Sequence, residues 1–131
     1  MSVGRGTVVP FQIYGHPDFY IGSYAFTPRS KPGASQPKYE GEICYGQNLK
    51  AYAENYHQLP IRLNLTWLIE SYKFLKPKQE FFIPYFEKLS GTYKLREQII
   101  KGYSEEEIRA SWKTDLEAFQ KIRSKYLLYK N

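Results

Sequence analysis

The chain has 131 residues, of which 42% are hydrophobic and 18% aromatic, and its formal net charge is +6. This length fits one domain and the apolar content can form a core, so the composition excludes an intrinsically disordered chain. No apolar run reaches the ~20 residues that a membrane helix needs, and residues 1–7 show no signal peptide.

The first third of the chain is expected to form short strands and ordered loops. Seven of the nine glycines and five of the eight prolines lie in the first 46 residues, where they interrupt regular structure. Three runs have strand-like composition: residues 10–14, 23–27 and 39–45, ended by Gly15, Pro28 and Gly46. Residues 29–38 are too broken for a regular element, and ordered loops of this kind often carry function.

From about residue 63 onward, the spacing of apolar residues becomes helical. A helix is expected over residues 63–75, and Pro77 is expected to stop it. The aromatic residues 81–86 predict a second, short helix with Pro84 near its first turn. Gly91 is expected to end this short helix. A third helix is expected from an N-cap at Thr92 to Lys101, with Gly102 as its C-terminal cap.

The final helix has the clearest N-terminal signal. Ser104 and Glu107 form a capping box, in which the hydroxyl and the carboxylate each bind an unpaired backbone amide. An apolar stripe follows at helical spacing: Ile108, Trp112, Leu116, Phe119, Ile122 and Tyr126. Such a stripe could form a ligand groove, but core packing is its usual role. We therefore predict an α+β fold, with short, mostly antiparallel strands packed against about four α-helices, including a long C-terminal one.

Few residue types offer catalysis or metal binding. Cys44 is the single cysteine, so an internal disulfide is excluded, and its strand-like neighbours favour a buried structural thiol over a nucleophile. His16 and His57 lie far apart, so we expect no metal site and no cofactor. His16 either contacts a ligand or lies on a surface turn.

Acid–base chemistry and nucleic acid binding have weak support. Glycoside hydrolysis needs two facing carboxylates, and outside the helical half no acidic pair has an obvious catalytic arrangement, although Glu40 and Glu42 would share one face of a strand. The basic residues are spread along the chain, with five among residues 1–50 and fourteen in the rest. A nucleic-acid-binding surface usually concentrates them, so we expect no nucleic acid partner.

The segment at residues 4–7 is the most suggestive local motif. Gly4 and Gly6 allow positive φ angles and leave amides exposed. Arg5 between them presents a guanidinium group that suits a carboxylate or a phosphate. A tight turn with a solvated arginine is the alternative, and the spacing alone does not decide between the two.

Several segments, taken in order, carry a family resemblance: residues 2–7, 10–11, 14–15, 26–28, 38–39, 41 and 44–46, then 89–92, 95–96, 112 and 123–129. Together they resemble the C-terminal domain of the NamZ-type exo-β-N-acetylmuramidases. These bacterial glycosidases release N-acetylmuramic acid from the non-reducing ends of peptidoglycan fragments. The similarity runs through essentially the whole chain, and residues 2–7 and 126–129 are its most specific parts.

The resemblance implies that residues 1–131 are a single domain of a larger, two-domain glycosidase. In that family a Rossmann-like N-terminal half carries the proposed catalytic glutamate, and the cleft lies where the two domains meet. This chain would then form one wall of the active site and lack the catalytic carboxylate, so activity of the chain alone is doubtful. Its partners would be muramic-acid-containing peptidoglycan fragments and the N-terminal domain, and the full-length protein would be periplasmic or secreted.

The resemblance also implies an anion receptor, because N-acetylmuramic acid carries a lactyl carboxylate. Arg5 is the first candidate, and Arg29 and Lys38 are secondary, while Tyr14 and Tyr39 could contact the sugar. Packing or loop rigidity is the competing role for the last four. The expected substrate-binding residues are Gly4, Arg5, Gly6, Thr7, Tyr14, Arg29, Lys38 and Tyr39, with no catalytic residue. The alternative function is a stand-alone, non-catalytic module that binds a glycan or a protein.

Overall fold

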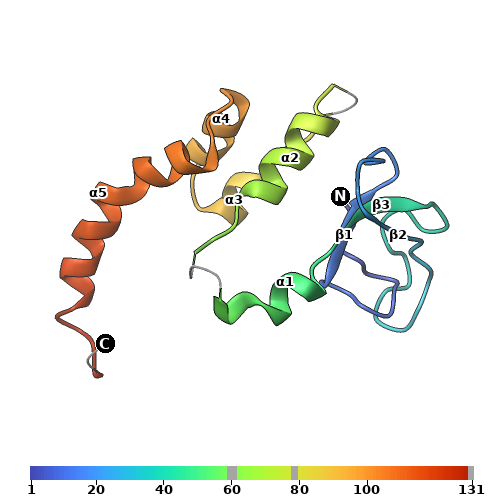
Figure 1. Ribbon diagram of the computed structural model, residues 1–131, viewed down its shortest axis with the longest axis horizontal. Helices are drawn as coiled ribbons and strands as arrows, with labels where there is room; N and C mark the ends of the chain where they lie inside the picture. The colour runs from blue at the N-terminus through green and yellow to red at the C-terminus, as the bar shows by residue number, and fades with distance from the viewer. Residues whose placement is uncertain (59–61, 78–79, 130–131) are drawn as a thin grey trace. The chain divides into compact units, whose positions relative to one another are not determined.

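The computed structural model describes residues 1–58, 62–77 and 80–129, coloured along the chain in Figure 1. The chain divides into two compact units. Unit 1 comprises Met1–Asn64 with Lys73–Lys78, and unit 2 comprises Leu65–Tyr72 with Gln79–Asn131. The described residues form three strands, five α-helices and one 3-10 helix, so the expected α+β class is confirmed. None of the helices in these ranges has both the length and the apolar character needed to cross a bilayer.

Unit 1 is built on a three-stranded antiparallel sheet with the order β1-β3-β2. The strands are β1 (Ile13–His16), β2 (Tyr24–Phe26) and β3 (Cys44–Asn48), followed by α1 (Lys50–Glu54) and the 3-10 helix Tyr56–Gln58. The central strand β3 pairs Gly46 with Gly15 of β1, and Cys44 with Phe26 of β2. The prediction of short antiparallel strands is therefore confirmed.

The first and third strands begin and end later than predicted, and most of the predicted run 39–45 precedes β3 and is not strand. Gly15 and Gly46 therefore lie inside β1 and β3 and do not end them. These glycines face each other across the sheet. A Cβ atom on Gly15 would lie 2.6 Å from the Tyr45 carbonyl oxygen, and one on Gly46 would lie 2.6 Å from the Gly15 Cα. The glycines therefore permit a close approach of neighbouring backbones.

The core of unit 1 lies against this sheet. Ile13, Phe26 and Cys44 are buried together, and partly buried side chains from the flanking segments pack around them. Burial raises the pKa of the Cys44 thiol to about 11, with a further contribution from the Glu42 carboxylate. A buried, protonated thiol is a poor nucleophile, and the prediction that Cys44 is buried is confirmed.

Unit 2 is helical. It contains α3 (Phe86–Ser90), α4 (Lys94–Ile100), α5 (Glu105–Arg123) and most of α2 (Thr66–Leu75), whose last residues belong to unit 1. Its buried core consists of Leu65, Ile69, Phe82, Leu95, Ile99 and Ile108. The helix expected over residues 63–75 is confirmed, although it begins at Thr66.

The aromatic segment is the exception among the helix predictions. The helix begins at Phe86 and not at Phe81, because the Phe86 amide donates to the Ile83 carbonyl and closes a turn around Pro84. The residues before this turn are not helical, and Phe82 is buried in the core. Gly91 ends α3 with a φ of 71°, as expected.

The starts of α4 and α5 differ in their capping. The N-cap of α4 is Tyr93, which makes no side-chain capping bond, and not Thr92 as expected, although the Thr92 hydroxyl accepts a hydrogen bond from the Lys94 amide. The predicted capping box of Ser104 and Glu107 is complete in both directions. The pKa of Glu107 is lowered because the Ser104 amide and hydroxyl both donate to its carboxylate.

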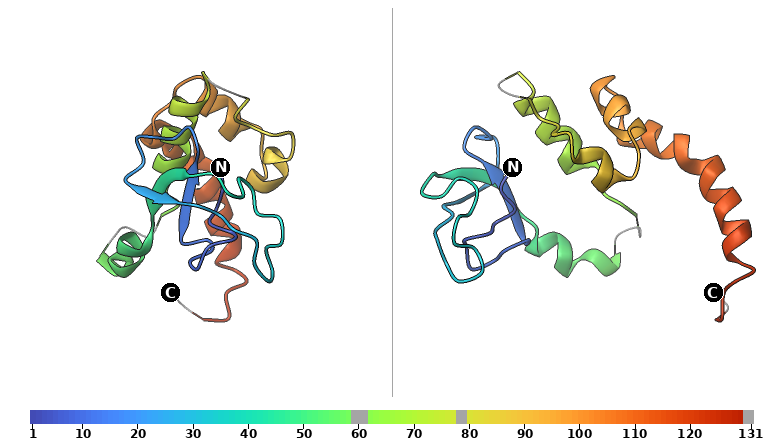
Figure 2. Two further views of the ribbon diagram at one scale, coloured as in Figure 1. Left: turned by 90° about the vertical axis from the view of Figure 1, so that its right-hand side faces the viewer. Right: turned by 180° about the vertical axis from the view of Figure 1, so that it is seen from behind.

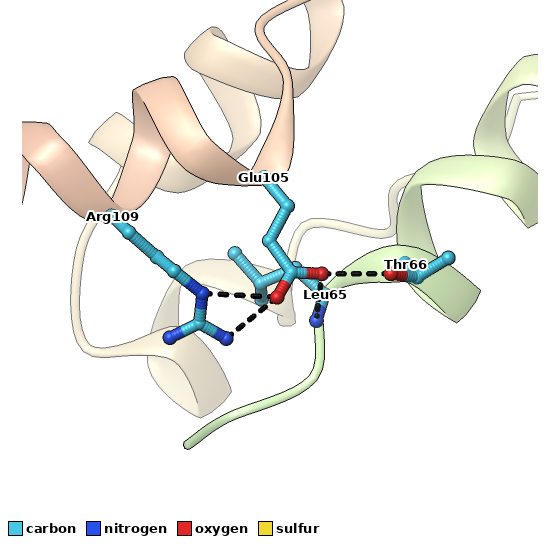
Figure 3. Close-up of polar contacts among 4 residues, drawn as sticks. All are labelled: Leu65, Thr66, Glu105 and Arg109. Carbon is cyan, nitrogen blue, oxygen red and sulfur yellow. Dashed lines mark hydrogen bonds and ion pairs between the residues drawn. The ribbon is translucent and has the colours of Figure 1, made fainter. Parts of the chain in front are cut away.

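A second carboxylate connects α5 to the start of α2 (Figure 3). Glu105 is 8% exposed, and it accepts hydrogen bonds from the Leu65 amide at 3.0 Å, the Thr66 hydroxyl at 2.8 Å and the Arg109 guanidinium at 2.7 and 2.9 Å. Burial acts to raise the pKa of Glu105, but the bonds from Thr66, Arg109 and Leu65 outweigh it, and the pKa is lowered. One acidic side chain therefore ties two helices of unit 2 together.

The apolar stripe on α5 is only partly buried. Ile108 is in the core and Trp112 packs against it, but Leu116, Phe119 and Ile122 are 52–59% exposed, and Tyr126 is also exposed. The prediction that the stripe packs in the core is therefore wrong for its C-terminal half. Figure 2 shows the reason, since this half of α5 extends away from the other helices of unit 2.

Candidate functional site

Backbone hydrogen bonds hold the segment around Arg5 in place within unit 1. Ser2 and Gly15 exchange two of them, at 2.7 and 3.0 Å, and the Gly6 carbonyl accepts one from the Arg29 amide at 2.9 Å. Gly4 and Gly6 have φ angles of 76° and 81°, the positive values expected for them. A Cβ atom on Gly6 would lie 2.6 Å from the Arg29 carbonyl oxygen. The two glycines thus allow the turn that presents Arg5.

Thr7 stabilises the same turn from inside. Its hydroxyl donates to the Gly4 carbonyl at 2.7 Å and accepts from the Val9 amide at 3.2 Å. Because both contacts are local, the Thr7 side chain fixes the backbone conformation on which the orientation of Arg5 depends.

Arg5 is exposed, and it lines two neighbouring depressions in the surface of unit 1. The larger has a volume of about 660 Å³ and is also lined by Ser2, Val3 and residues 33–38. The smaller, of about 160 Å³, is lined by parts of residues 5–11 and 31–34. The guanidinium donates one hydrogen bond, to the Gly33 carbonyl at 3.1 Å. Among the residues that the structure describes, no carboxylate pairs with Arg5.

The charges around the two depressions have one sign. Arg5 and Lys38 line the larger depression, Arg5 and Lys31 line the smaller one, and the described lining residues of both include no Asp or Glu. A concave surface whose charged side chains are all cationic attracts anions. It offers no pair of carboxylates for acid–base chemistry. The geometry therefore suits binding of a negatively charged ligand and not glycosidic bond cleavage within these depressions.

The loop formed by residues 29–40 contributes to the lining of both depressions, through residues 33–38 in the larger one and residues 31–34 in the smaller one. The loop is closed at its base by hydrogen bonds from the Gly41 amide to the Pro28 carbonyl and from the Ser30 amide to the Glu40 carboxylate, each 2.9 Å long. An ordered loop was expected here. Glu40 and Glu42 precede β3, so the expectation that they share a strand face is wrong, and Glu40 instead holds the loop closed.

Three of the expected binding residues lie outside the two depressions. Tyr14 is half-buried in β1, opposite Gln47, and Arg29 is exposed, but neither lines either of these two depressions. The Tyr39 ring packs against the core of unit 1 and has the Lys38 amino group 5.0 Å from its centroid. The depressions therefore bring Arg5 and Lys38 together, but not Tyr14, Arg29 or Tyr39.

The structure contradicts one of the two interpretations of His16, a position on a surface turn. It is the last residue of β1, it is only 4% exposed, and its ring contacts the edge of the Tyr39 ring at 4.9 Å. Its Nδ1 atom accepts a hydrogen bond from the Asp18 amide at 3.0 Å. His16 is therefore a buried strand residue and not part of a surface turn. Within the described ranges, no group of three or more His, Cys, Asp or Glu side chains could hold a metal ion.

The smaller depression contains one residue, Phe11, that the sequence analysis did not identify as a candidate binding residue. Phe11 is 71% exposed and has a φ of 64°, a left-handed conformation that costs a bulky residue about 1–3 kcal/mol. Nothing in its neighbourhood in the sequence predicts this conformation. The only signal was its place beside Pro10 within the family resemblance.

The comparisons with known proteins agree with one another. A family model described as the C-terminal part of exo-β-N-acetylmuramidase NamZ matches residues 1–129. The chain is 30% identical to the peptidoglycan β-N-acetylmuramidase NamZ of Bacillus subtilis over an aligned region of 142 residues, gaps included, and this region covers 98% of this chain and 34% of that protein. A solved structure of a DUF1343 family protein from Bacteroides fragilis superimposes with a TM-score of 0.86 at 44% identity, covering 99% of this chain and 36% of the other. The chain thus spans about a third of the length of each relative.

Proposed function

This chain belongs to the family of exo-β-N-acetylmuramidase NamZ C-terminal domains, and from that premise we propose that it is the substrate-binding part of a peptidoglycan glycosidase. The enzyme would release N-acetylmuramic acid from the non-reducing ends of peptidoglycan fragments. Because peptidoglycan lies outside the cytoplasmic membrane, the full-length protein would act in the periplasm or after secretion. The Bacillus subtilis relative is named a peptidoglycan β-N-acetylmuramidase.

The observation that supports this proposal is the exposed guanidinium of Arg5, which lines both depressions beside Lys31 and Lys38 with no acidic neighbour in the lining. N-acetylmuramic acid differs from N-acetylglucosamine by a lactyl ether with a carboxylate. A guanidinium can bind a carboxylate through two parallel hydrogen bonds. Such a charged contact contributes about 1.5–3 kcal/mol when it is shielded from water. Arg5 would then select the acidic sugar.

Catalysis would depend on the remainder of the longer protein. The described lining residues of the two depressions include no carboxylate, and a glycosidase of the usual kind uses two. The chain spans 34% of its Bacillus subtilis relative. We place the catalytic carboxylate in the Rossmann-like N-terminal domain that the family resemblance implies, and this chain would contribute one wall of the cleft.

A binding comparison tests the role of Arg5. The purified chain is titrated with N-acetylmuramic acid and with N-acetylglucosamine, and binding is followed by NMR chemical shifts. We expect Arg5→Ala to weaken binding of the acidic sugar by about tenfold or more and to leave the neutral sugar unaffected. Arg29→Ala is the matched control, because Arg29 is an exposed arginine that lines neither depression. Equal binding of the two sugars by the unaltered chain would contradict the anion-receptor role.

A stand-alone, non-catalytic binding module is the alternative, favoured by the acid-free lining of the depressions. An enzyme part and a stand-alone module should respond differently when the portion of the relative that this chain does not cover is added. Adding the portion of the Bacillus subtilis relative that this chain does not cover should restore hydrolysis of a muramic-acid glycoside if the chain is part of an enzyme. A mixture without activity, together with sugar binding by the chain alone, would favour the module.

A further inference from the structure

Phe11 combines strain with exposure, and within the described part of the chain its ring belongs to neither hydrophobic core cluster. Its backbone is held in the left-handed region by a 2.8 Å hydrogen bond from its amide to the Val3 carbonyl, and the next amide, of Gln12, bonds to the Val9 carbonyl at 3.2 Å. Glycine or asparagine adopts this conformation more readily than phenylalanine. The large ring nevertheless remains mostly in solvent.

Tyr39 provides an internal comparison. It has nearly the same φ, 61°, but its ring is half-buried and packs against the core of unit 1 and against His16. Packing therefore accounts for an aromatic residue at that strained position. Among the described residues, Phe11 has no comparable place in either core cluster. A strained residue that is not explained by packing is a reason to look for a binding role.

The position of the Phe11 ring indicates what it would bind. Phe11 lines the smaller depression together with Arg5, Thr7 and Lys31. An apolar ring and two cationic side chains therefore border the same depression. Binding sites for small molecules commonly combine aromatic surfaces with a few charged groups that set orientation. A pyranose ring presents an apolar face of C–H groups, and an acidic substituent on that ring could reach a guanidinium beside it.

We propose that Phe11 is a stacking platform for the pyranose ring whose acidic substituent binds Arg5. This inference rests on the proposed sugar-binding function and extends it to a specific residue. The site thus recognises a sugar ring and a carboxylate together. It binds N-acetylmuramic acid more tightly than it binds a small carboxylate such as lactate, which carries the charge but has no ring to stack.

The test compares Phe11→Gly and Phe11→Trp with the unaltered chain. Dissociation constants for N-acetylmuramic acid and for lactate are measured by NMR titration, and Tm by circular dichroism. We expect Phe11→Gly to bind N-acetylmuramic acid about tenfold more weakly and to bind lactate as before, while Phe11→Trp retains tight sugar binding. Because glycine relieves the strained φ, Tm should stay constant or rise by up to about 4 °C. Val8→Ala is the control, since Val8 is 85% exposed in the same segment but lines neither depression.

The outcomes separate this inference from the proposed function. If the unaltered chain binds N-acetylmuramic acid through Arg5 but Phe11→Gly binds it equally well, the platform is overturned and the anion receptor stands. If Phe11→Gly lowers Tm by more than about 5 °C, the ring has a structural role and the platform is also overturned. If the unaltered chain does not bind the sugar at all, both proposals fail together.

Discussion

Gly46 shows how strongly one residue can depend on its neighbours in the sheet. A Cβ atom at this position would overlap the Tyr14 carbonyl oxygen and would lie 2.6 Å from the Gly15 Cα, and both obstacles are backbone atoms that cannot rotate away. We therefore expect Gly46→Ala to destabilise unit 1 by more than about 3 kcal/mol. Gly33→Ala is the control, because a Cβ there meets nothing within 4 Å and only the positive φ of 80° opposes it. That change should cost about 1 kcal/mol.

The stability of unit 1 in these variants can be measured through the reactivity of the Cys44 thiol. It is the only cysteine, it is buried in unit 1, and burial raises its pKa to about 11. Labelling by a thiol reagent at increasing urea concentration therefore reports the opening of unit 1. If Gly46→Ala and Gly33→Ala shift the labelling midpoint equally, the close approach of the strands does not limit the choice of residue at position 46.

The same glycines explain where residue-level prediction from the sequence failed. Gly15 and Gly46 were expected to end strands because glycine commonly breaks them, but their neighbours in the sheet require them inside β1 and β3. The strained φ of Phe11 depends likewise on the Val3 carbonyl, which its amide binds. Features set by such non-local partners leave little trace in the local sequence.

At the scale of helices, Glu105 makes the stability of unit 2 dependent on pH. Its pKa is lowered in the folded chain, so its ionised form contributes stability above the ordinary value of 4.5, and this contribution is lost as the pH falls through the lowered pKa. Glu105→Gln should therefore be less stable by about 2 kcal/mol at pH 7, because it leaves the Arg109 and Leu65 donors poorly paired. Below about pH 4.5 its stability should change less than that of the unaltered chain.

Tryptophan fluorescence can follow this effect, because Trp67 and Trp112, the two tryptophans of the chain, both belong to unit 2. Urea unfolding is measured at pH 7 and at several values below 4.5. Glu117→Gln serves as the control, since Glu117 is exposed and its contact with Lys113, at 3.9 Å, is a surface pair. Equal loss of stability in acid for Glu105→Gln and the unaltered chain would show that Glu105 does not control this transition.

The helices also show which signals a sequence carries. The capping box of Ser104 and Glu107 and the stop at Gly91 were both recognised, because each depends on residues within one turn. The predicted burial of the α5 stripe was too large. An apolar stripe shows which face of a helix can pack, but it does not show whether another element lies against that face. Of the residues in this stripe, only Ile108 belongs to the core cluster of unit 2 and only Trp112 packs against it. Pattern therefore identified the helix, while the contacts of unit 2 decided which half of it is buried.

For the chain as a whole, the sequence identified the family and part of the candidate site. Arg5 was selected because a guanidinium between two glycines suits an anion, and the structure places it at two depressions whose described lining residues include no acid. Lys38 lies beside it at the larger one. Tyr14 and Tyr39 could not be sorted from the sequence, because a tyrosine that packs in a sheet and one that lines a depression have the same local pattern.

The net charge of +6 leads to a prediction about ionic strength. Because Arg5, Lys31 and Lys38 surround open depressions, their attraction for a carboxylate is exposed to salt, and the screening length falls from about 30 Å at 0.01 M to about 3 Å at 1 M. Binding of N-acetylmuramic acid should therefore weaken several-fold over this range, while any binding of neutral N-acetylglucosamine should change little. Titrations of both sugars at four salt concentrations measure how steeply the affinity for each sugar falls with salt.

Two arginine variants separate local from general attraction. Arg5→Ala should flatten the salt dependence of binding for the acidic sugar, whereas Arg29→Ala should preserve it. Both variants lose one positive charge, but only Arg5 lines the depressions. Identical slopes for the two variants would mean that the overall charge of the molecule, and not a local receptor, attracts the anion.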